Sequence, residues 1–365
     1  MKWLALFCFT LCMQSMAHSQ TEKVPLRIGV VGLTHTHVHW ILGREKIGDI
    51  EIVGVAEPNR DLAKRYMDQH GFSLDLVFDS LEEMIETVKP DAVTAFGTIY
   101  DHLKVVEVCA PKGIHVMVEK PLAVSFEHAK KMAALAKKHG IQLLTNYETT
   151  WYPTNHEAFR LLHTDSIGAL RKVVVHDGHQ GPKEIGVNDE FLEWLTDPEL
   201  NGAGALTDFG CYGANLITWL AKGQRPISVF AITQQIKPDI YPNVDDEATI
   251  ILEYPTFQGI IQASWNWPVS RKDMEVYGEK GYAIAKNGKD LIFRKNEKSK
   301  EELVEMQSRE YPLNDPFALL ATVIQSGMEL PPYDLNSLEN NLLVNEILSA
   351  ALESAKTGKK IYLDR

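Results

Sequence analysis

Cysteine is scarce in this 365-residue chain, and its scarcity excludes a disulfide-built fold. The sequence contains four cysteines, and Cys8 and Cys12 lie within the first 19 residues. Only Cys109 and Cys211 remain beyond that stretch, over a hundred residues apart. Small secreted domains that depend on disulfides carry many more. The fold must therefore be built from an ordinary apolar core, for which 45% hydrophobic residues are sufficient.

An excess of positive charge is also missing. The formal net charge is −12 at pH 7, and no basic stripe interrupts the sequence. Nucleic acids and anionic membranes attract basic surfaces. We therefore expect no nucleic-acid partner and no membrane partner, but a small-molecule substrate.

The chain has one apolar run near its start, and it is too short to span a membrane as a normal helix. Lys2 precedes the apolar segment 3–16, and Ala17 and Ser19 place small residues where a signal peptidase cleaves. Residues 1–19 are therefore predicted to be a signal peptide that exports the protein. We expect a periplasmic location if the cell has two membranes.

The rest of the chain predicts two domains. Between residues 24 and 146, short apolar strands alternate with helical segments, which is typical of a doubly wound parallel sheet. From 147 to 365, consecutive strands with short turns predict a large, mostly antiparallel open sheet, followed by a closing helix capped at Asn336. The expected fold class is an α/β Rossmann domain plus an α+β substrate and oligomerisation domain.

A charged pair ends one of the predicted strands. The apolar run from His115 leads directly into Glu119, Lys120 and Pro121. Carboxyl ends of strands in an open parallel sheet face the ligand crevice. A solvated strand end is the simpler interpretation, but the pair also suits a reactive site.

The turn after the first strand lacks the glycines of a dinucleotide fingerprint. Gly32 is present, but Thr34 and His37 occupy the other two glycine positions. These glycines normally allow the backbone to approach a pyrophosphate and the helix to approach the sheet. Glu57 ends the second strand with a carboxylate suited to a ribose 2′-hydroxyl, which favours NAD over NADP; it could instead be an anion at a helix N-terminus. The turn is expected to run into a helix that ends near Lys46.

The same turn gathers imidazoles. His35 and His37 alternate along it and can face one crevice, and imidazole readily binds borderline metals. A third ligand would come from elsewhere, with His102, His176 or His179 as candidates. Metal binding is an open alternative here and not the expected state.

A stretch of small residues from Gly202 to Gly213 contains Asp208 and, four positions later, Tyr212. Small residues let the backbone pack closely against a neighbour. Asp208, Tyr212 and Lys120 could lower one another's proton affinities enough for proton transfer. Three aromatic–polar groups suit a sugar ring, although packing on the sheet is as good an explanation for their tryptophans. They are Trp151-Tyr152-Pro153, His176-Asp177-Gly178-His179 and Trp265-Asn266-Trp267.

From Leu26 to about Leu363 the sequence resembles the Gfo/Idh/MocA family, named after glucose–fructose oxidoreductase and inositol dehydrogenase. The resemblance rests on Glu119-Lys120-Pro121, on Gly-x-Leu-x-Asp-x-Gly-x-Tyr-x-x-Asn over 204–215, and on their order along the chain. It implies hydride transfer between NAD and a hydroxyl of a sugar or sugar derivative, with assembly of copies through the second sheet. Relatives that use the same fold for net hydrolysis leave a redox-assisted or metal-assisted glycoside lyase or hydrolase as the alternative.

The resemblance also implies roles for particular residues. Lys120 would orient the reacting hydroxyl, Tyr212 would be the acid/base group, and Asp208 would bind substrate. The implied cofactor contacts are Gly32, Thr34, His35, His37, Glu57, His102, Glu119 and Lys120.

Overall fold

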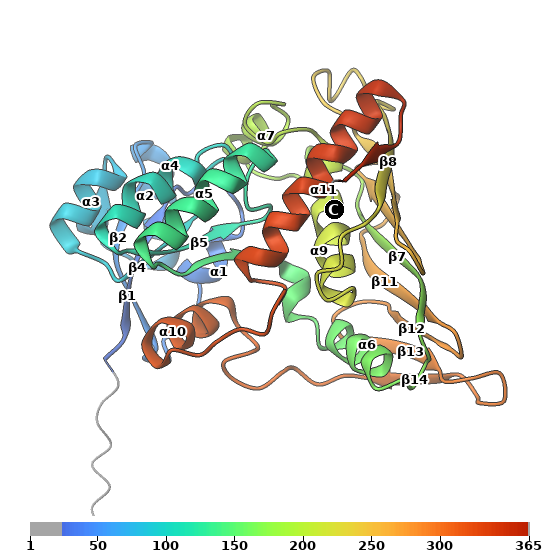
Figure 1. Ribbon diagram of the computed structural model, residues 1–365. Helices are drawn as coiled ribbons and strands as arrows, with labels where there is room; N and C mark the ends of the chain where they lie inside the picture. Colours follow the sequence, from blue (N-terminus) through green and yellow to red (C-terminus); the bar gives the residue numbers. More distant parts are fainter. Residues whose placement is uncertain (1–23, 364–365) are drawn as a thin grey trace, which may run out of the picture.

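The computed structural model describes residues 24–363, so the predicted signal peptide lies outside the described part. Two sheets, each with its own helices, make up the molecule (Figure 1). In the described range, no helix combines the length and apolarity needed to cross a membrane.

The first sheet has six parallel strands in the order β3-β2-β1-β4-β5-β6. They are β1 (Leu26–Val31), β2 (Ile50–Ala56), β3 (Val77–Phe78), β4 (Ala92–Ala95), β5 (His115–Glu119) and β6 (Leu143–Asn146). The order reverses between β1 and β4, which is where an open α/β sheet forms its ligand crevice. The doubly wound parallel sheet predicted from the sequence is confirmed.

Helices cover both faces of this sheet. One face carries α1 (Val38–Leu42), α2 (Arg60–His70) and α10 (Pro316–Ser326), and the other carries α3 (Leu81–Val88), α4 (His102–Cys109) and α5 (Phe126–His139). Short 3₁₀ turns, η1 (Leu74–Leu76) and η2 (Ala110–Lys112), join the elements. Sequence analysis did not anticipate α10, which returns from the far end of the chain to bury Phe317 and Leu320 with β1.

The second sheet has nine strands in the order β14-β13-β12-β11-β7-β10-β9-β8-β15. They are β7 (Leu170–Gly178), β8 (Ser228–Gln234), β9 (Glu247–Glu253), β10 (Gln258–Ser264), β11 (Arg271–Gly278), β12 (Tyr282–Ala285), β13 (Asp290–Arg294), β14 (Glu302–Glu305) and β15 (Ile361–Tyr362). All neighbours are antiparallel except β7 and β10. The mostly antiparallel open sheet is therefore also confirmed.

One face of the second sheet packs on helices. These are α6 (Pro153–His163), α8 (Ala205–Asp208), α9 (Gly210–Leu220) and α11 (Leu338–Thr357). Within the described residues, no helix lies over the other face (Figure 1). The helix α7 (Asp189–Leu195), whose apolar side chains join the core of the second domain, and the turn η3 (Glu148–Trp151) complete that domain, and α11 also contacts α5 of the first domain.

Two predicted helix boundaries are wrong. The helix expected to run to about Lys46 ends at Leu42, where Gly43 closes it. The last helix is capped by Ser337, whose hydroxyl accepts a hydrogen bond from the Asn340 amide, and not by Asn336. The Asn336 side chain instead donates to the carbonyl of Thr145, at the end of β6.

Candidate active site

The candidate site lies at the carboxyl edge of the first sheet, where α8 and α9 of the second domain reach the end of β5. The Lys120 ammonium donates to Oδ1 of Asp208 at 2.5 Å and to the Asp208 carbonyl at 3.0 Å. Trp265 Nε1 donates to the other carboxylate oxygen at 3.0 Å. All three side chains are buried. Lys120 and Asp208, which are 88 positions apart in the sequence, thus form a buried ion pair.

Close backbone packing holds Asp208 in place. A Cβ on Gly204 would lie 1.7 Å from the carbonyl oxygen of Asp245, so only glycine fits there. The Asp245 carboxylate accepts hydrogen bonds from the amides of Gly204 and Leu206, at 2.9 and 2.7 Å. This anchors the start of α8 and so sets the position of Asp208 at its end. The close packing expected from the small residues in this stretch is confirmed.

Two ammonium groups lie near the ring of Tyr212. The Nζ atoms of Lys120 and Lys272 are 5.1 and 4.6 Å from the centre of its ring. Burial raises the pKa of Tyr212 well above its ordinary value, and the carboxylates of Glu148 and Asp177 raise it further. The phenol therefore stays protonated at neutral pH.

The predicted mutual lowering of proton affinities is wrong for two of the three groups. Burial lowers the pKa of Lys120, but the Asp208 carboxylate outweighs it and the net pKa is raised. Tyr212 is also raised, and only the pKa of Asp208 falls, because Lys120 overcomes the opposing effect of burial. The pairing with Asp208 therefore favours the charged form of Lys120.

Sequence analysis missed Lys272 and Glu148, and it placed Asp177 only in an aromatic–polar group. The Lys272 ammonium pairs with Glu148. Lys272 on β11 lies opposite Asp177 on β7, and Asp177 Oδ1 is buried without a hydrogen-bond partner among the described residues. Burial raises the pKa of Asp177 well above its ordinary value. No sequence signal marks Lys272, because only the register between β7 and β11 brings it to the site.

The first turn departs from a phosphate-binding loop in the way its sequence suggested. Gly32 has φ +74°, and a Cβ there would lie 2.7 Å from the Gly97 nitrogen, so this glycine is required. The hydroxyl of Thr34 accepts from Trp194 Nε1 at 3.0 Å, and the Thr34 carbonyl accepts from Asn188. Residues at and just before α7 therefore cover Thr34, whose hydroxyl is already engaged.

His35 and His37 meet Glu119 at this turn. His37 Nδ1 lies 2.9 Å from Glu119 Oε2, and the His37 amide donates to His35 Nδ1 at 3.1 Å. Burial raises the pKa of Glu119, but the nearby imidazoles outweigh it and lower the pKa to about 2. The predicted third partner was one of three other histidines, and Glu119 takes that place instead.

Those three histidines lie elsewhere. His176 is bonded to Asp273 at 3.0 Å, on the sheet face opposite Asp177, because successive strand residues point to opposite faces. His179 packs its ring edge-on against Phe209, close to Asp208. His102 Nδ1 donates to the Leu122 carbonyl at 3.1 Å, and its Nε2 is buried without a partner in the described range.

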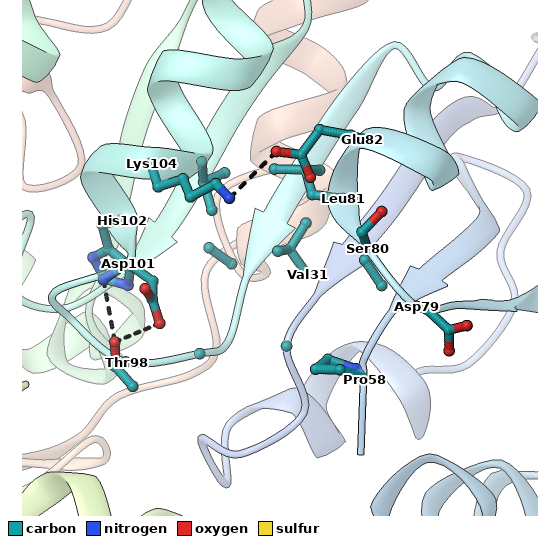
Figure 2. Close-up of a pocket in the computed structure, with 15 residues that line it drawn as sticks. Val31, Pro58, Asp79, Ser80, Leu81, Glu82, Thr98, Asp101, His102 and Lys104 are labelled. Carbon is teal, nitrogen blue, oxygen red and sulfur yellow. Dashed lines mark hydrogen bonds and ion pairs between the residues drawn. The ribbon is translucent and has the colours of Figure 1, made fainter. Parts of the chain in front are cut away.

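A cavity of about 290 Å³ opens at the carboxyl ends of β1, β2 and β4 (Figure 2). Gly32, Pro58, Ser80 and Thr98 are among the residues that line it. Glu57 lies at the end of β2 but points back, accepting from the amides of Leu33 and Asn59 at 2.9 and 2.8 Å. The contact with Asn59, the N-cap of α2, agrees with the alternative of an anion at a helix N-terminus, and any contact with a ribose would be additional.

The cavity and the strand ends could hold the nucleoside end of a dinucleotide, but the turn after β1 is not open to its pyrophosphate in the usual way. The cavity suits a nucleoside at the switch point, and Lys120 lies farther along the same edge of the sheet. Between them, α7 covers the turn at the position where a fingerprint would bind the pyrophosphate. A bound cofactor would be held by the Gly32 loop and the cavity rather than by Thr34.

Comparison with known proteins identifies the scaffold. Residues 26–147 match the oxidoreductase family with an NAD-binding Rossmann fold, and residues 156–284 match the GFO/IDH/MocA C-terminal domain. The chain belongs to the Gfo/Idh/MocA oxidoreductase family. The resemblance and the NAD-binding type of the first domain are thereby confirmed.

Curated relatives of this Gfo/Idh/MocA protein are dehydrogenases. It is 26% identical over 235 residues to the trans-1,2-dihydrobenzene-1,2-diol dehydrogenase of Xenopus tropicalis, covering 64% of this chain and 66% of that one. It is 24% identical over 262 residues to the scyllo-inositol 2-dehydrogenase (NADP(+)) of Bacillus subtilis, covering 71% and 75%. The match to the frog enzyme thus spans just under two thirds of its length.

Solved structures share the fold. The aldose-aldose oxidoreductase from Caulobacter crescentus complexed with glycerol has a TM-score of 0.79 at 22% identity, covering 93% of this chain and 100% of that one. An inositol dehydrogenase homolog complexed with NAD⁺ from Azotobacter vinelandii has a TM-score of 0.77 at 17% identity, covering 93% and 97%. At these identities the likeness concerns the fold alone.

Two further expectations concern the tryptophans. Trp265 is fully buried and bonded to Asp208, so it packs inside the site rather than presenting its face to a sugar. Trp151 is half-buried, and its Nε1 donates to Asn146 Oδ1 at 3.1 Å. Packing, the simpler explanation, is correct for Trp265.

The burial of His102 predicts a pH dependence of stability. Burial lowers its pKa to about 4 in the folded protein, against 6.5 as the ordinary value. Between these values the unfolded chain binds more protons, so stability falls as the pH drops below 6.5. From pH 7.5 to pH 5 the wild type should lose about 2 kcal/mol more than His102→Asn in urea-unfolding measurements. Equal losses in the two proteins would show that His102 is not held neutral.

Proposed function

We propose that this protein is an NAD(P)-dependent oxidoreductase that acts on a hydroxyl of a sugar or sugar derivative. The observation that carries the proposal is the meeting of Lys120, Asp208 and Tyr212 at the carboxyl edge of a Rossmann sheet. Family membership supports the redox chemistry, and the relatives' names concern diols, inositols and aldoses. All three kinds of substrate carry the reacting hydroxyl on a ring or polyol carbon.

Lys120, Tyr212 and Asp208 would orient the substrate, stabilise its developing charge and transfer a proton. A bound nicotinamide supplies the hydride acceptor or donor. Lys120, a cation at neutral pH, would orient the substrate oxygen and stabilise negative charge that develops on it. Because the Tyr212 phenol is protonated, it would donate a proton to a carbonyl oxygen during reduction and then recover a proton from water. In the reverse direction the phenol would first release its proton to water, and the phenolate would accept the proton of the substrate hydroxyl. Asp208 would hold the ammonium in place.

The walls near Tyr212 suit a ligand rich in hydroxyls. Asp177 offers a buried carboxyl oxygen without a partner, and Lys272 and Glu148 add a donor and an acceptor. Such polar groups fix the orientation of a small ligand and discriminate against analogues that lack a hydroxyl. We therefore propose that the substrate binds beside Tyr212, within reach of Asp177 and Lys272.

One observation favours a second candidate function, metal-assisted cleavage of a glycoside. Glu119 joins His35 and His37, so that three potential metal ligands converge at the edge of the same site. This function depends on metal binding by these side chains, and NAD-dependent chemistry does not.

We also propose that copies assemble through the uncovered face of the second sheet. Phe230 and Ile232 on β8 lie beside Ile251 on β9, which pairs with Ile260 on β10. Ile232 and Ile251 are 56% and 37% exposed. A contiguous apolar patch on a sheet face is typical of a subunit interface.

Export to the periplasm is proposed from the pattern of residues 1–19 alone. Sequencing the N-terminus of protein from a periplasmic extract tests it, because cleavage should remove those 19 residues. An uncleaved N-terminus in a cytoplasmic fraction would contradict it.

The roles of Lys120 and Tyr212 predict separate losses of turnover. With a substrate found by screening sugars and cyclitols with NAD⁺ and NADP⁺, Lys120→Met and Tyr212→Phe should each lower kcat roughly a hundredfold, as loss of a charge-stabilising or acid/base group does. Tyr254→Phe changes a buried tyrosine that follows β9 and stacks on Phe257; it is the matched control and should retain the parent rate. Parent-level turnover in both site variants would refute the assignment.

Cofactor choice tests the position of Glu57. If the ribose lies near this carboxylate, NAD should bind better than NADP by about one to a few kcal/mol in calorimetry, because a 2′-phosphate would meet a negative charge. Glu57→Gln should reduce this preference, while Glu82→Gln, a second carboxylate at the cavity, serves as the control. Equal affinities for the two nucleotides in the wild type would remove Glu57 from the cofactor site.

The interface proposal predicts a change of mass in solution. Ile232→Asp with Ile251→Asp places two charges on the apolar patch, so the assembly should dissociate to monomers in light scattering. Leu303→Asp, an equally drastic change on the edge strand β14, should leave the mass unchanged. A wild type that is monomeric at micromolar concentration would end the proposal.

A further inference from the structure

Three potential metal ligands converge at the turn after β1, where His37 takes a position that a dinucleotide fingerprint fills with glycine. His35 and His37 follow β1, and Glu119 is the last residue of β5. Each offers one ligand atom, and these atoms lie within 4.8 Å of one another. The strand order β1-β4-β5 brings together groups that are more than 80 positions apart.

The kinds of atom match a transition metal. Two imidazoles and one carboxylate form a three-ligand set that zinc and related first-row metals use when a fourth position is left for a non-protein ligand. Calcium and magnesium prefer oxygen ligands, and this cluster offers only one carboxylate. These three side chains are therefore expected to prefer zinc or a related first-row transition metal to calcium or magnesium.

Neighbouring groups fix each potential ligand in orientation. His35 Nδ1 accepts from the His37 amide at 3.1 Å, which fixes the orientation of the His35 ring. The His37 ring stacks on Trp40, with centroids 3.8 Å apart. Glu119 Oε1 accepts from Asn146 Nδ2 at 2.7 Å, so Oε2 alone faces His37. Hydrogen bonds and ring contacts that orient the ligand side chains in this way are characteristic of metal sites.

Further contacts hold Asn146 and His35 in place. Asn146 Oδ1 accepts from Trp151 Nε1, which fixes the amide that holds Glu119. The ring of Phe191, from α7, lies 4.6 Å from the ring of His35. The nearby Lys120 ammonium is paired with Asp208, so its charge is largely compensated. A dication beside it is therefore electrostatically tolerable.

We propose that His35, His37 and Glu119 form a binding site for one divalent first-row transition metal, with a coordination position left for an oxygen of the substrate. The 2.9 Å separation of His37 Nδ1 and Glu119 Oε2 has to open only by several tenths of an ångström for both atoms to bind one ion. This site goes beyond the proposed oxidoreductase function and does not depend on it.

Direct metal titration tests the site without substrate or nucleotide. Full-length mature protein, stripped with chelator, is titrated with Zn²⁺ by calorimetry and with Co²⁺ by visible absorption. The wild type should bind one equivalent and give the intense Co²⁺ bands of a four- or five-coordinate site. His35→Asn, His37→Asn and Glu119→Gln should each weaken binding by about a hundredfold or more, because each removes one of three ligands.

Matched controls separate this site from other histidines. His39→Asn changes the third imidazole of the same turn, which is bonded to His70 at 2.8 Å, and should leave the titration unchanged. Glu275→Gln alters the cluster His176–Asp273–Glu275 on the outer sheet face and should also leave it unchanged. Loss of the bound equivalent in either control, or its retention in the three ligand variants, would overturn the proposal.

A milder variant covers the case in which ligand variants do not fold. Asn146→Ala removes only the hydrogen bond that orients Glu119, and should weaken Zn²⁺ binding by about tenfold to a hundredfold. Circular dichroism of each apo protein establishes that it is folded. A wild type that binds no Zn²⁺ at micromolar concentration would refute the site, whatever the outcome of the nicotinamide assays.

Discussion

The buried ion pair between Lys120 and Asp208 is the constraint on which the site depends. Both side chains are almost wholly removed from water, with 6% and 7% exposure, so each charge needs the other. Removing one partner of such a pair typically costs about 3–5 kcal/mol, because the remaining charge is left buried and unpaired. The pair joins the end of β5 to the end of α8, and it therefore fixes the second domain against the carboxyl edge of the first sheet.

Around this pair the protein keeps the family scaffold and alters its cofactor turn. Gly32 retains the backbone conformation that the turn needs, whereas α7 covers Thr34 and the imidazole of His37 turns toward Glu119. Thr34 and His37, which stand at the two glycine positions, each make a specific contact: Thr34 with Trp194, and His37 with Glu119. The family's edge of the sheet thus contains both a nucleotide-sized cavity and a set of potential metal ligands.

Much of the fold could be predicted because its strands are short, apolar and regularly spaced. The strand β5 with Glu119 and Lys120 at its end is the clearest case, since a charged pair after a buried run marks the edge of a parallel sheet. Sequence analysis did not anticipate α10, because nothing local to residues 316–326 shows that this segment returns from the far end of the chain to the core of the first domain. Lys272 was missed for a similar reason: a strand's pattern does not reveal which register carries a lysine into a site.

The sequence by itself determined the two-domain architecture, the family, and the residue types Lys120, Asp208 and Tyr212 that meet in the site. Periodicity and local motifs encode these features, because they depend on neighbours in the chain. Only the tertiary structure decided that Glu119, rather than a distant histidine, joins His35 and His37, and that Glu57 binds backbone amides. It also decided the proton affinities, since the pKa values of Lys120 and Tyr212 depend on burial and on charges brought together from both domains.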